Sequence, residues 1–183
     1  MTKMAIPLLN REIGILEFNS RVLAQAEDSS NPLLERLRFL GIVSSNLDEF
    51  FEVRVAGLKE QLQTDPKKIE ADGLSILETY DKVTEYAHTL VARQYAVFND
   101  IIQPQLGQAG IRFMFAQDWT PEQEKWAHRI FNTELLPLLT PIALDPAHPF
   151  PKVANKSLNF IVSLDGKDAF GRRARLAVVQ APR

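Results

Sequence analysis

The chain has 183 residues, of which 45% are hydrophobic and 24% charged, a composition typical of a soluble globular protein with one or two domains. Its formal net charge of −2 gives no overall attraction for nucleic acid or for an anionic membrane. The sequence contains no cysteine, which excludes disulfides, thiolate catalysis and zinc sites of the Cys type and fits an intracellular protein.

The N-terminal stretch MTKMAIPLLN contains an apolar run that is too short for the core of a signal peptide. No segment approaches the roughly 20 apolar residues that a membrane-spanning helix needs. The sequence therefore predicts a cytoplasmic protein without a transmembrane segment, and it leaves peripheral contact with a membrane open.

Two helices are predicted in the first third of the chain. Apolar residues recur at helical spacing from Asn10 to Glu27, and Asn10 is placed to cap the first turn. The pair Asn31 and Pro32 then favours a second helix that begins at Pro32. Its apolar residues step by three, four or seven positions and allow one long helix: Leu33, Leu37, Leu40, Val43, Leu47, Phe51, Val55, Leu58 and Leu62.

A third long helical segment follows a charged linker at residues 64–73. Its apolar stripe runs over residues 74–102, and Pro104 and Gly107 are expected to end it. Together these segments predict an antiparallel helical bundle over residues 1–108.

The pattern changes in residues 109–183. A helix is expected from residue 121 to about residue 136, and the five prolines of residues 135–151 preclude a regular helix there. Residues 157–164 and 175–180 are predicted to be strands. Two or three strands and one helix cannot close a sheet, so we expect a domain that continues beyond this chain.

The fold class expected from these elements is α+β. An N-terminal antiparallel helical bundle forms the first domain, over residues 1–108, and an incomplete mixed α/β domain forms the second, over residues 109–183.

The stretch SSNLDEFFEVR, residues 44–54, places polar side chains within the apolar stripe of the second helix. Ser45 followed three residues later by Asp48 matches a capping box, which predicts that a helix restarts at Asn46. A functional alternative starts from helical geometry, which places Asn46, Phe50 and Val53 on one flank beside the apolar stripe and Arg54 close to the stripe itself. An amide and a guanidinium next to an aromatic ring can hold a planar ligand with a polar edge, such as adenine. For Arg54 an ion pair with an acid of a neighbouring helix is the competing interpretation.

The other groups of polar residues in the sequence give little support for a catalytic or metal-binding site. His88, His128 and His148 are far apart and form no metal-binding motif, and the familiar phosphate-binding and nucleophile loops do not occur. Asp48 and Glu49 have no nucleophile or metal ligand near them in the sequence. The one local basic cluster consists of Lys167, Arg172, Arg173 and Arg175, and it fits a solvated hairpin tip or a contact with a polyanion.

Three segments together carry a family resemblance. NPLLERLRFLGI and SNLDEFFEVRVAGL lie within residues 10–61, and LLTPIALDPAHPFPKVANKSLNFIVSL covers residues 138–164. The first two resemble the N-terminal domain of bacterial polyphosphate kinase, and the third resembles the start of the head domain of the same family. This family transfers the terminal phosphate of ATP reversibly onto inorganic polyphosphate. The resemblance implies a nucleotide-binding kinase of four domains, of which this chain holds the first and part of the second.

The resemblance also implies where the site residues lie. The ATP-contacting asparagine of the family falls on Asn46. Phe50 and Arg54, selected from helical geometry, are the supporting candidates. The phosphorylated histidine and the ligands of Mg²⁺ belong to C-terminal domains, so no catalytic or metal-binding residue is expected in this chain and the chain alone is expected to be inactive. The head domain of the family makes subunit contacts, which implies a homo-oligomer.

Two other functions remain to be compared with this one. The chain fits a non-catalytic helical module for interaction or dimerisation, which ATP binding through Asn46 would argue against. A nucleic-acid binder using the basic cluster near the end is disfavoured by the net charge.

Overall fold

The computed structural model describes residues 8–145, 149–154, 156–165 and 176–182. These residues form two compact units, divided between Phe113 and Met114.

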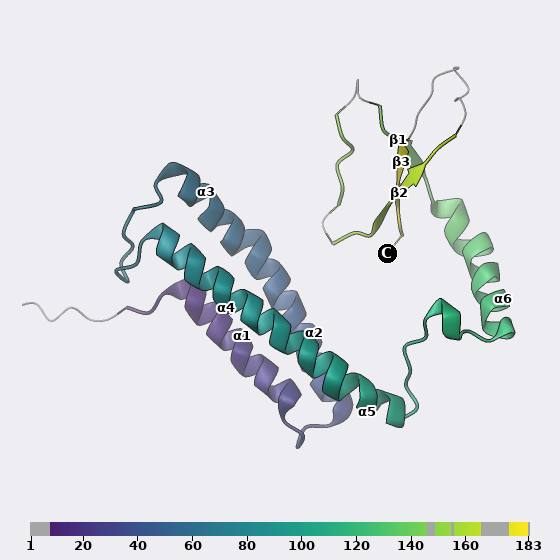
Figure 1. Cartoon of the computed structure of the whole chain (residues 1–183), viewed down its shortest axis with the longest axis horizontal. Helices are drawn as coiled ribbons and strands as arrows, with labels where there is room; N and C mark the ends of the chain where they lie inside the picture. The colour runs from purple at the N-terminus through teal and green to yellow at the C-terminus, as the bar shows by residue number, and fades with distance from the viewer. Residues whose placement is uncertain (1–7, 146–148, 155, 166–175, 183) are drawn as a thin grey trace, which may run out of the picture. The chain divides into compact units, whose positions relative to one another are not determined.

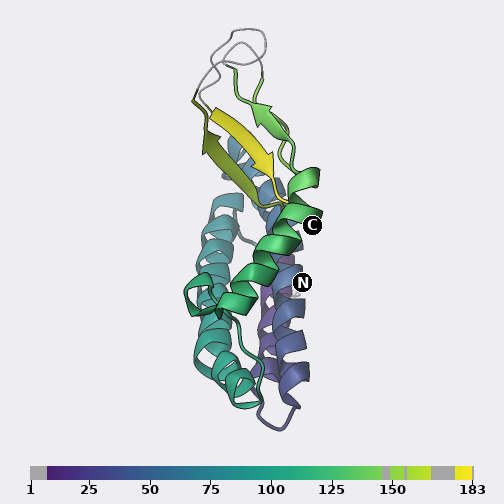
Figure 2. The same cartoon turned by 90° about the vertical axis from the view of Figure 1, so that its right-hand side faces the viewer.

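The first unit is a bundle of three long helical segments that lie side by side (Figure 1) and remain so when the view is turned (Figure 2). Short connections join successive segments, so neighbouring segments run antiparallel. The segments are α1 (Arg11–Glu27); α2 (Leu33–Glu49), a π-helical turn (Phe50–Val55) and α3 (Ala56–Thr64); and α4 (Ile76–Ala96), a second π-helical turn (Val97–Ile102) and α5 (Gln103–Gln108).

Side chains at the helix starts supply the hydrogen bonds that the first turns lack. The side chain of Asn10 accepts hydrogen bonds from the backbone N–H groups of Glu12 and Ile13, both at 3.0 Å, as its predicted role as N-cap requires. Ser75 and Glu78 form a capping box at the start of α4, in which Ser75 N donates to Glu78 Oε2 at 2.8 Å and Glu78 N donates to Ser75 Oγ at 3.2 Å.

The core of the bundle is one cluster of buried apolar side chains from all three segments. Burial at this spacing is the main reason why these sequences are helical, since helix propensity alone is weak. The cluster comprises Leu16, Leu23, Ala26, Leu40, Val43, Leu47, Phe50, Val55, Leu58, Ile76, Val83, Ala87, Leu90, Val97, Ile102 and Leu106.

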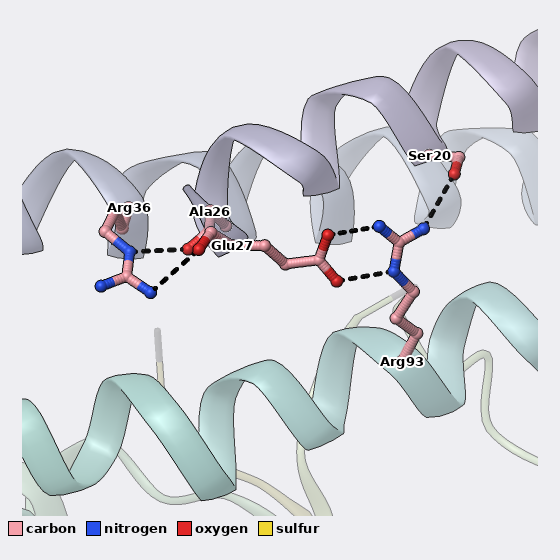
Figure 3. Close-up of polar contacts among 5 residues, drawn as sticks. All are labelled: Ser20, Ala26, Glu27, Arg36 and Arg93. Carbon is pink, nitrogen blue, oxygen red and sulfur yellow. Dashed lines mark hydrogen bonds and ion pairs between the residues drawn. The ribbon is translucent and has the colours of Figure 1, made fainter. Parts of the chain in front are cut away.

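Two arginines fix the end of α1 to the other helices (Figure 3). Arg36 is buried, and its Nε donates to the carbonyl of Ala26 at 2.8 Å while Nη1 donates to Gln105 Oε1 at 2.9 Å. Arg93 of α4 forms a two-pronged ion pair with the carboxylate of Glu27 and donates to Ser20 Oγ at 3.1 Å. The carboxylate of Glu27 raises the pKa of Arg93 further.

The prediction of a long second helix is confirmed, but the predicted restart at Asn46 is wrong. Ser45 lies inside α2 and is exposed, and the helix continues without interruption from Leu33 to Thr64. The capping box is not formed because the buried stripe continues through Val43 and Leu47, and a break would expose this stripe. The helix departs from α geometry later, in the π-helical turn that begins at Phe50.

The third segment ends next to Gly107, as predicted, but Pro104 does not interrupt it. The helix continues through Pro104 to Gln108. In a regular α-helix proline removes one hydrogen bond and collides with the carbonyl four residues back. Here the π-helical turn directly precedes it, and the N–H of Gln103 reaches the carbonyl of Phe98, five residues back. We attribute the tolerance of Pro104 to this wider turn.

The second unit contains a helix and a small antiparallel sheet. Thr120 caps α6 (Pro121–Ile130), and a π-helical turn (Phe131–Leu135) and a short 3₁₀ turn (Leu136–Leu138) follow it. The sheet has the order β1 (Pro141–Ala143), β3 (Leu176–Gln180), β2 (Asn159–Ser163), with Ile142 and Ile161 both opposite Val178. The predicted strands near residues 157–164 and 175–180 are confirmed, as is the α+β class.

Candidate functional site

A cavity of about 270 Å³ lies between α1 and the long second helix of the bundle. Both polar and apolar side chains line it, which suits a ligand with a flat apolar face and a polar edge. The lining residues are Ile15, Phe18, Asn19, Asn46, Glu49, Phe50, Val53 and Arg54.

The residues predicted to share one flank of the helix all lie on this cavity. Asn46 comes from the last turn of α2, and Phe50, Val53 and Arg54 come from the π-helical turn that follows. A π-helical turn changes the angle between successive side chains, and such turns are frequent at functional sites. The structure therefore brings together the side chains selected from the sequence, while their role in binding ATP stays a prediction.

A short chain of hydrogen bonds holds Asn46. Its Nδ2 donates to Asn19 Oδ1 at 2.8 Å, and Asn19 Nδ2 in turn donates to the backbone carbonyl of Ile15 at 3.0 Å. Asn19 is only 1% exposed, whereas Asn46 is half-buried at the cavity. Among the described residues, the Oδ1 atom of Asn46 accepts no hydrogen bond.

Arg54 forms the ion pair with an acid of a neighbouring helix that was predicted as the alternative to ligand binding. Its Nε lies 3.9 Å from Oε2 of Glu12 on α1, at the limit of an ion pair. Within the part of the chain that the structure describes, Glu12 Oε2 is buried and has no hydrogen-bond donor. The ion pair is thus present but long, and Arg54 still lines the cavity.

Phe50 contributes less free aromatic surface than the sequence suggested. It is 2% exposed and packs edge-to-face against Phe51, with ring centroids 6.0 Å apart. Phe18 of α1 lines the same cavity and is 51% exposed, so it offers the accessible aromatic ring. The guanidinium of Arg21 lies 5.9 Å from the centroid of this ring.

Reasoning from the sequence missed Phe18 and Asn19. For Asn19 a signal existed, because it lies three residues after Leu16 and four before Leu23 on the buried stripe of α1. A polar side chain on such a stripe needs a partner, and here the partner is Asn46. Phe18 gave no signal, since isolated exposed aromatic residues are common.

The three histidines do not meet. His88 is exposed on α4, the Nε2 of His128 lies 3.9 Å from Glu124 on α6, and His148 lies outside the described residues. Within the described ranges, no group of three His, Cys, Asp or Glu side chains could hold a metal ion. The basic cluster Lys167, Arg172, Arg173 and Arg175 lies outside those ranges.

Two models of known protein families match this chain. Residues 8–114 match the model of the polyphosphate kinase N-terminal domain, and residues 122–183 match that of the polyphosphate kinase middle domain. The chain belongs to the polyphosphate kinase family. Its helical unit corresponds to the N-terminal domain of this family, and the cavity at Asn46 lies in that domain.

Individual polyphosphate kinases are similar over almost the whole chain. Those of Burkholderia ambifaria and Paraburkholderia phytofirmans are 61% and 59% identical over 177 residues, which is 97% of this chain and 26% of each relative. The crystal structure of polyphosphate kinase from Porphyromonas gingivalis has a TM-score of 0.73 at 29% identity, covering 96% of this chain and 25% of that one. The chain thus spans about a quarter of the length of these polyphosphate kinases.

Among the described residues, no helix is both long and apolar enough to cross a bilayer.

Proposed function

We propose that this chain is the N-terminal part of a polyphosphate kinase, which transfers the terminal phosphate of ATP reversibly to inorganic polyphosphate. In this proposal the cavity around Asn46 forms one wall of the adenine site. A cytoplasmic location and a homo-oligomer are part of the same proposal. The family membership supports the reaction, and the free Oδ1 atom of Asn46 on an aromatic-lined cavity is the observation that supports the site.

The chemistry of adenine matches what the cavity offers. The 6-amino group of adenine is a hydrogen-bond donor at the edge of a flat ring, and an asparagine can pair with this edge through its oxygen and its amide. The half-exposed ring of Phe18 offers an apolar surface for the face of the base. Arg54 lies at the same cavity, and a change of partner from Glu12 would let it meet an anionic part of the ligand.

The transfer of phosphate itself is assigned to other parts of the protein. Phosphoryl transfer needs positioned cations around the phosphates, and a covalent phosphohistidine intermediate needs a histidine at the site. Among the described residues no group of three His, Cys, Asp or Glu side chains could hold a metal ion, and the family resemblance places the Mg²⁺ ligands in C-terminal domains. No step through magnesium or through His88 or His128 is assigned to this chain, and we expect the chain alone to transfer no phosphate.

The test is titration calorimetry with ATP on the chain and on the variant Asn46→Ala. We expect weak binding that the variant loses by about tenfold or more, because a hydrogen bond at the base edge is removed. Asn99→Ala is the matched control, since Asn99 is an exposed asparagine of the bundle outside the cavity. This control should bind as the unmodified chain does.

Equal binding by the chain and by Asn46→Ala would contradict the assignment of the adenine site. If neither binds ATP while the chain associates with copies of itself, the non-catalytic interaction module is the better description.

A further inference from the structure

We propose that Asn19 is a positioning residue that fixes the orientation of the Asn46 carboxamide and thereby makes the cavity selective for a purine with a 6-amino group. The inference rests on the proposed adenine site, but its first part concerns the free protein and can be tested without a nucleotide.

An asparagine side chain has two orientations that differ only by exchange of its oxygen and its nitrogen. The backbone carbonyl of Ile15 can only accept a hydrogen bond, so the atom of Asn19 that lies 3.0 Å from it must be the donor Nδ2. This contact leaves the Oδ1 atom of Asn19 directed to its other partner. The backbone of α1 therefore sets the orientation of the Asn19 amide.

The same reasoning sets the orientation of Asn46. Because Asn19 presents an acceptor, the atom of Asn46 that lies 2.8 Å from it must be the donor Nδ2. The Oδ1 atom of Asn46 is then the one left for a ligand. Asn19 is 1% exposed, so water cannot readily replace it in this contact, and an inverted Asn46 would place two oxygens against each other.

A fixed orientation discriminates between purines. Adenine presents its 6-amino donor to Oδ1, whereas a 6-oxo purine presents an oxygen and would be repelled. A freely rotating Asn46 could invert and pair with either base. A site that is built to form one particular hydrogen bond strongly rejects analogues that cannot form this bond. Apolar pockets discriminate between analogues much less.

The first experiment measures the orientation directly, by nuclear magnetic resonance of the nucleotide-free chain labelled with ¹⁵N. We expect one of the two Nδ2 protons of Asn46 to exchange slowly with water, and the variant Asn19→Leu to exchange it fast. The matched control is Asn99→Leu, which removes an exposed asparagine outside the cavity and should leave the slow exchange of the Asn46 proton unchanged. Fast exchange of both protons in the unmodified chain overturns the inference whether or not any variant folds.

The second experiment compares ATP with inosine triphosphate (ITP), whose base carries an oxygen in place of the 6-amino group. We expect the unmodified chain to prefer ATP by about tenfold. Asn19→Leu should reduce this preference to about twofold or less, while the control Asn99→Leu keeps it. A helix that is merely destabilised would weaken both nucleotides equally, so a preference for ATP that survives in Asn19→Leu overturns the inference.

The two proposals fail in different ways. If Asn46→Ala binds ATP as the unmodified chain does, the assignment of the adenine site is wrong. The slow exchange of the Asn46 amide proton in the unmodified chain can still be observed in that case. If Asn46→Ala loses ATP but Asn19→Leu keeps both the slow exchange and the preference, the adenine site stands and the positioning role of Asn19 is wrong.

Discussion

Arg36 is a buried cation, and among the described residues the acceptors of its hydrogen bonds are neutral oxygen atoms. Besides its bonds to Ala26 and Gln105, it reaches the carbonyl of Glu27 at 3.5 Å. Both carbonyls belong to the last turn of α1, whose end carries partial negative charge from the helix dipole. The guanidinium of Arg36 thus donates hydrogen bonds to backbone carbonyls at the end of α1. The backbone of Arg36 lies in the first turn of α2, and its Nη1 contacts Gln105 of α5, so this residue links three helices. This geometry needs a planar fork of donors, which arginine has and lysine lacks.

Replacing Arg36 by alanine should destabilise the bundle by about 2–4 kcal/mol, because several hydrogen bonds to a charged donor and a buried contact are lost together. Arg36→Lys should cost about half as much, since lysine keeps the charge but cannot reach all of these acceptors. Urea denaturation followed by circular dichroism measures both. The control is Arg38→Ala. The side chains of Arg38 and Glu35 are both exposed, with Nη1 and Oε2 3.6 Å apart, and we expect the loss of this pair to change the free energy of unfolding by less than about 0.5 kcal/mol. Equal losses for Arg36→Ala and Arg38→Ala would show that the buried contacts are not what stabilises this corner.

Among the helical elements, the start of α4 links stability to pH. Hydrogen bonds from the backbone N–H and the hydroxyl of Ser75 lower the pKa of Glu78 below its ordinary value of 4.5. Just before this helix, the backbone N–H of Leu74 and the side chain of Asn10 lower the pKa of Asp72 below 3.8. A carboxyl with a lowered pKa binds protons less readily in the folded state than in the unfolded state. It therefore contributes stability above the ordinary pKa, and this contribution is lost as the pH falls through the folded pKa.

We expect the midpoint of thermal unfolding to be nearly constant above about pH 5.5 and to fall below about pH 4.5 as Glu78 and Asp72 become protonated. Glu78→Gln should flatten part of this decline, because glutamine can still accept from Ser75 N but does not titrate in this range. Thermal scans from pH 3 to pH 7 provide the measurement. Glu85→Gln is the control on the exposed surface of the same helix and should leave the profile unchanged. A Glu78→Gln profile that coincides with that of the unmodified chain would contradict the assignment.

The elements that could be predicted from the sequence are those with many repeats of one pattern. The stripe from Leu33 to Leu62 spans eight turns and outweighs the local capping signal of Ser45 and Asp48, which is why the helix does not restart there. β1 was not predicted, because three residues in a proline-rich stretch are too short to show alternation. The flank with Asn46, Phe50 and Val53 could be predicted from helical geometry.

The partner side of the cavity could not be predicted in the same way, because it depends on which face of α1 meets α2. Asn19 is a contact between residues 27 positions apart in the chain, and a single sequence shows only that a polar residue lies on a buried stripe. The two π-helical turns were also missed, since they change hydrogen bonding without changing the apolar pattern in a recognisable way.

At the scale of the whole chain, the two units differ in how many of their apolar side chains are buried. Every member of the core cluster lies between Leu16 and Leu106. In the second unit the buried described residues are Ala177 and Val178 alone, and large apolar side chains of the edge strand β2 are exposed, with Phe160 at 52% and Ile161 at 66%. An exposed apolar edge strand is a template for association with another polypeptide.

We therefore expect that removing residues 114–183 leaves the urea midpoint of the helical unit within about 0.3 M of its value in the whole chain, because the removed residues contribute nothing to the core cluster. We also expect the whole chain to self-associate with rising concentration through this strand and the truncated chain not to do so, which sedimentation velocity measures. Ile161→Lys in the whole chain is the matched point variant, since it places a charge on the exposed strand without altering the bundle. A truncated chain that loses its helical signal would show that the bundle depends on the second unit. Self-association that persists after truncation would instead place the contact between copies on the bundle itself.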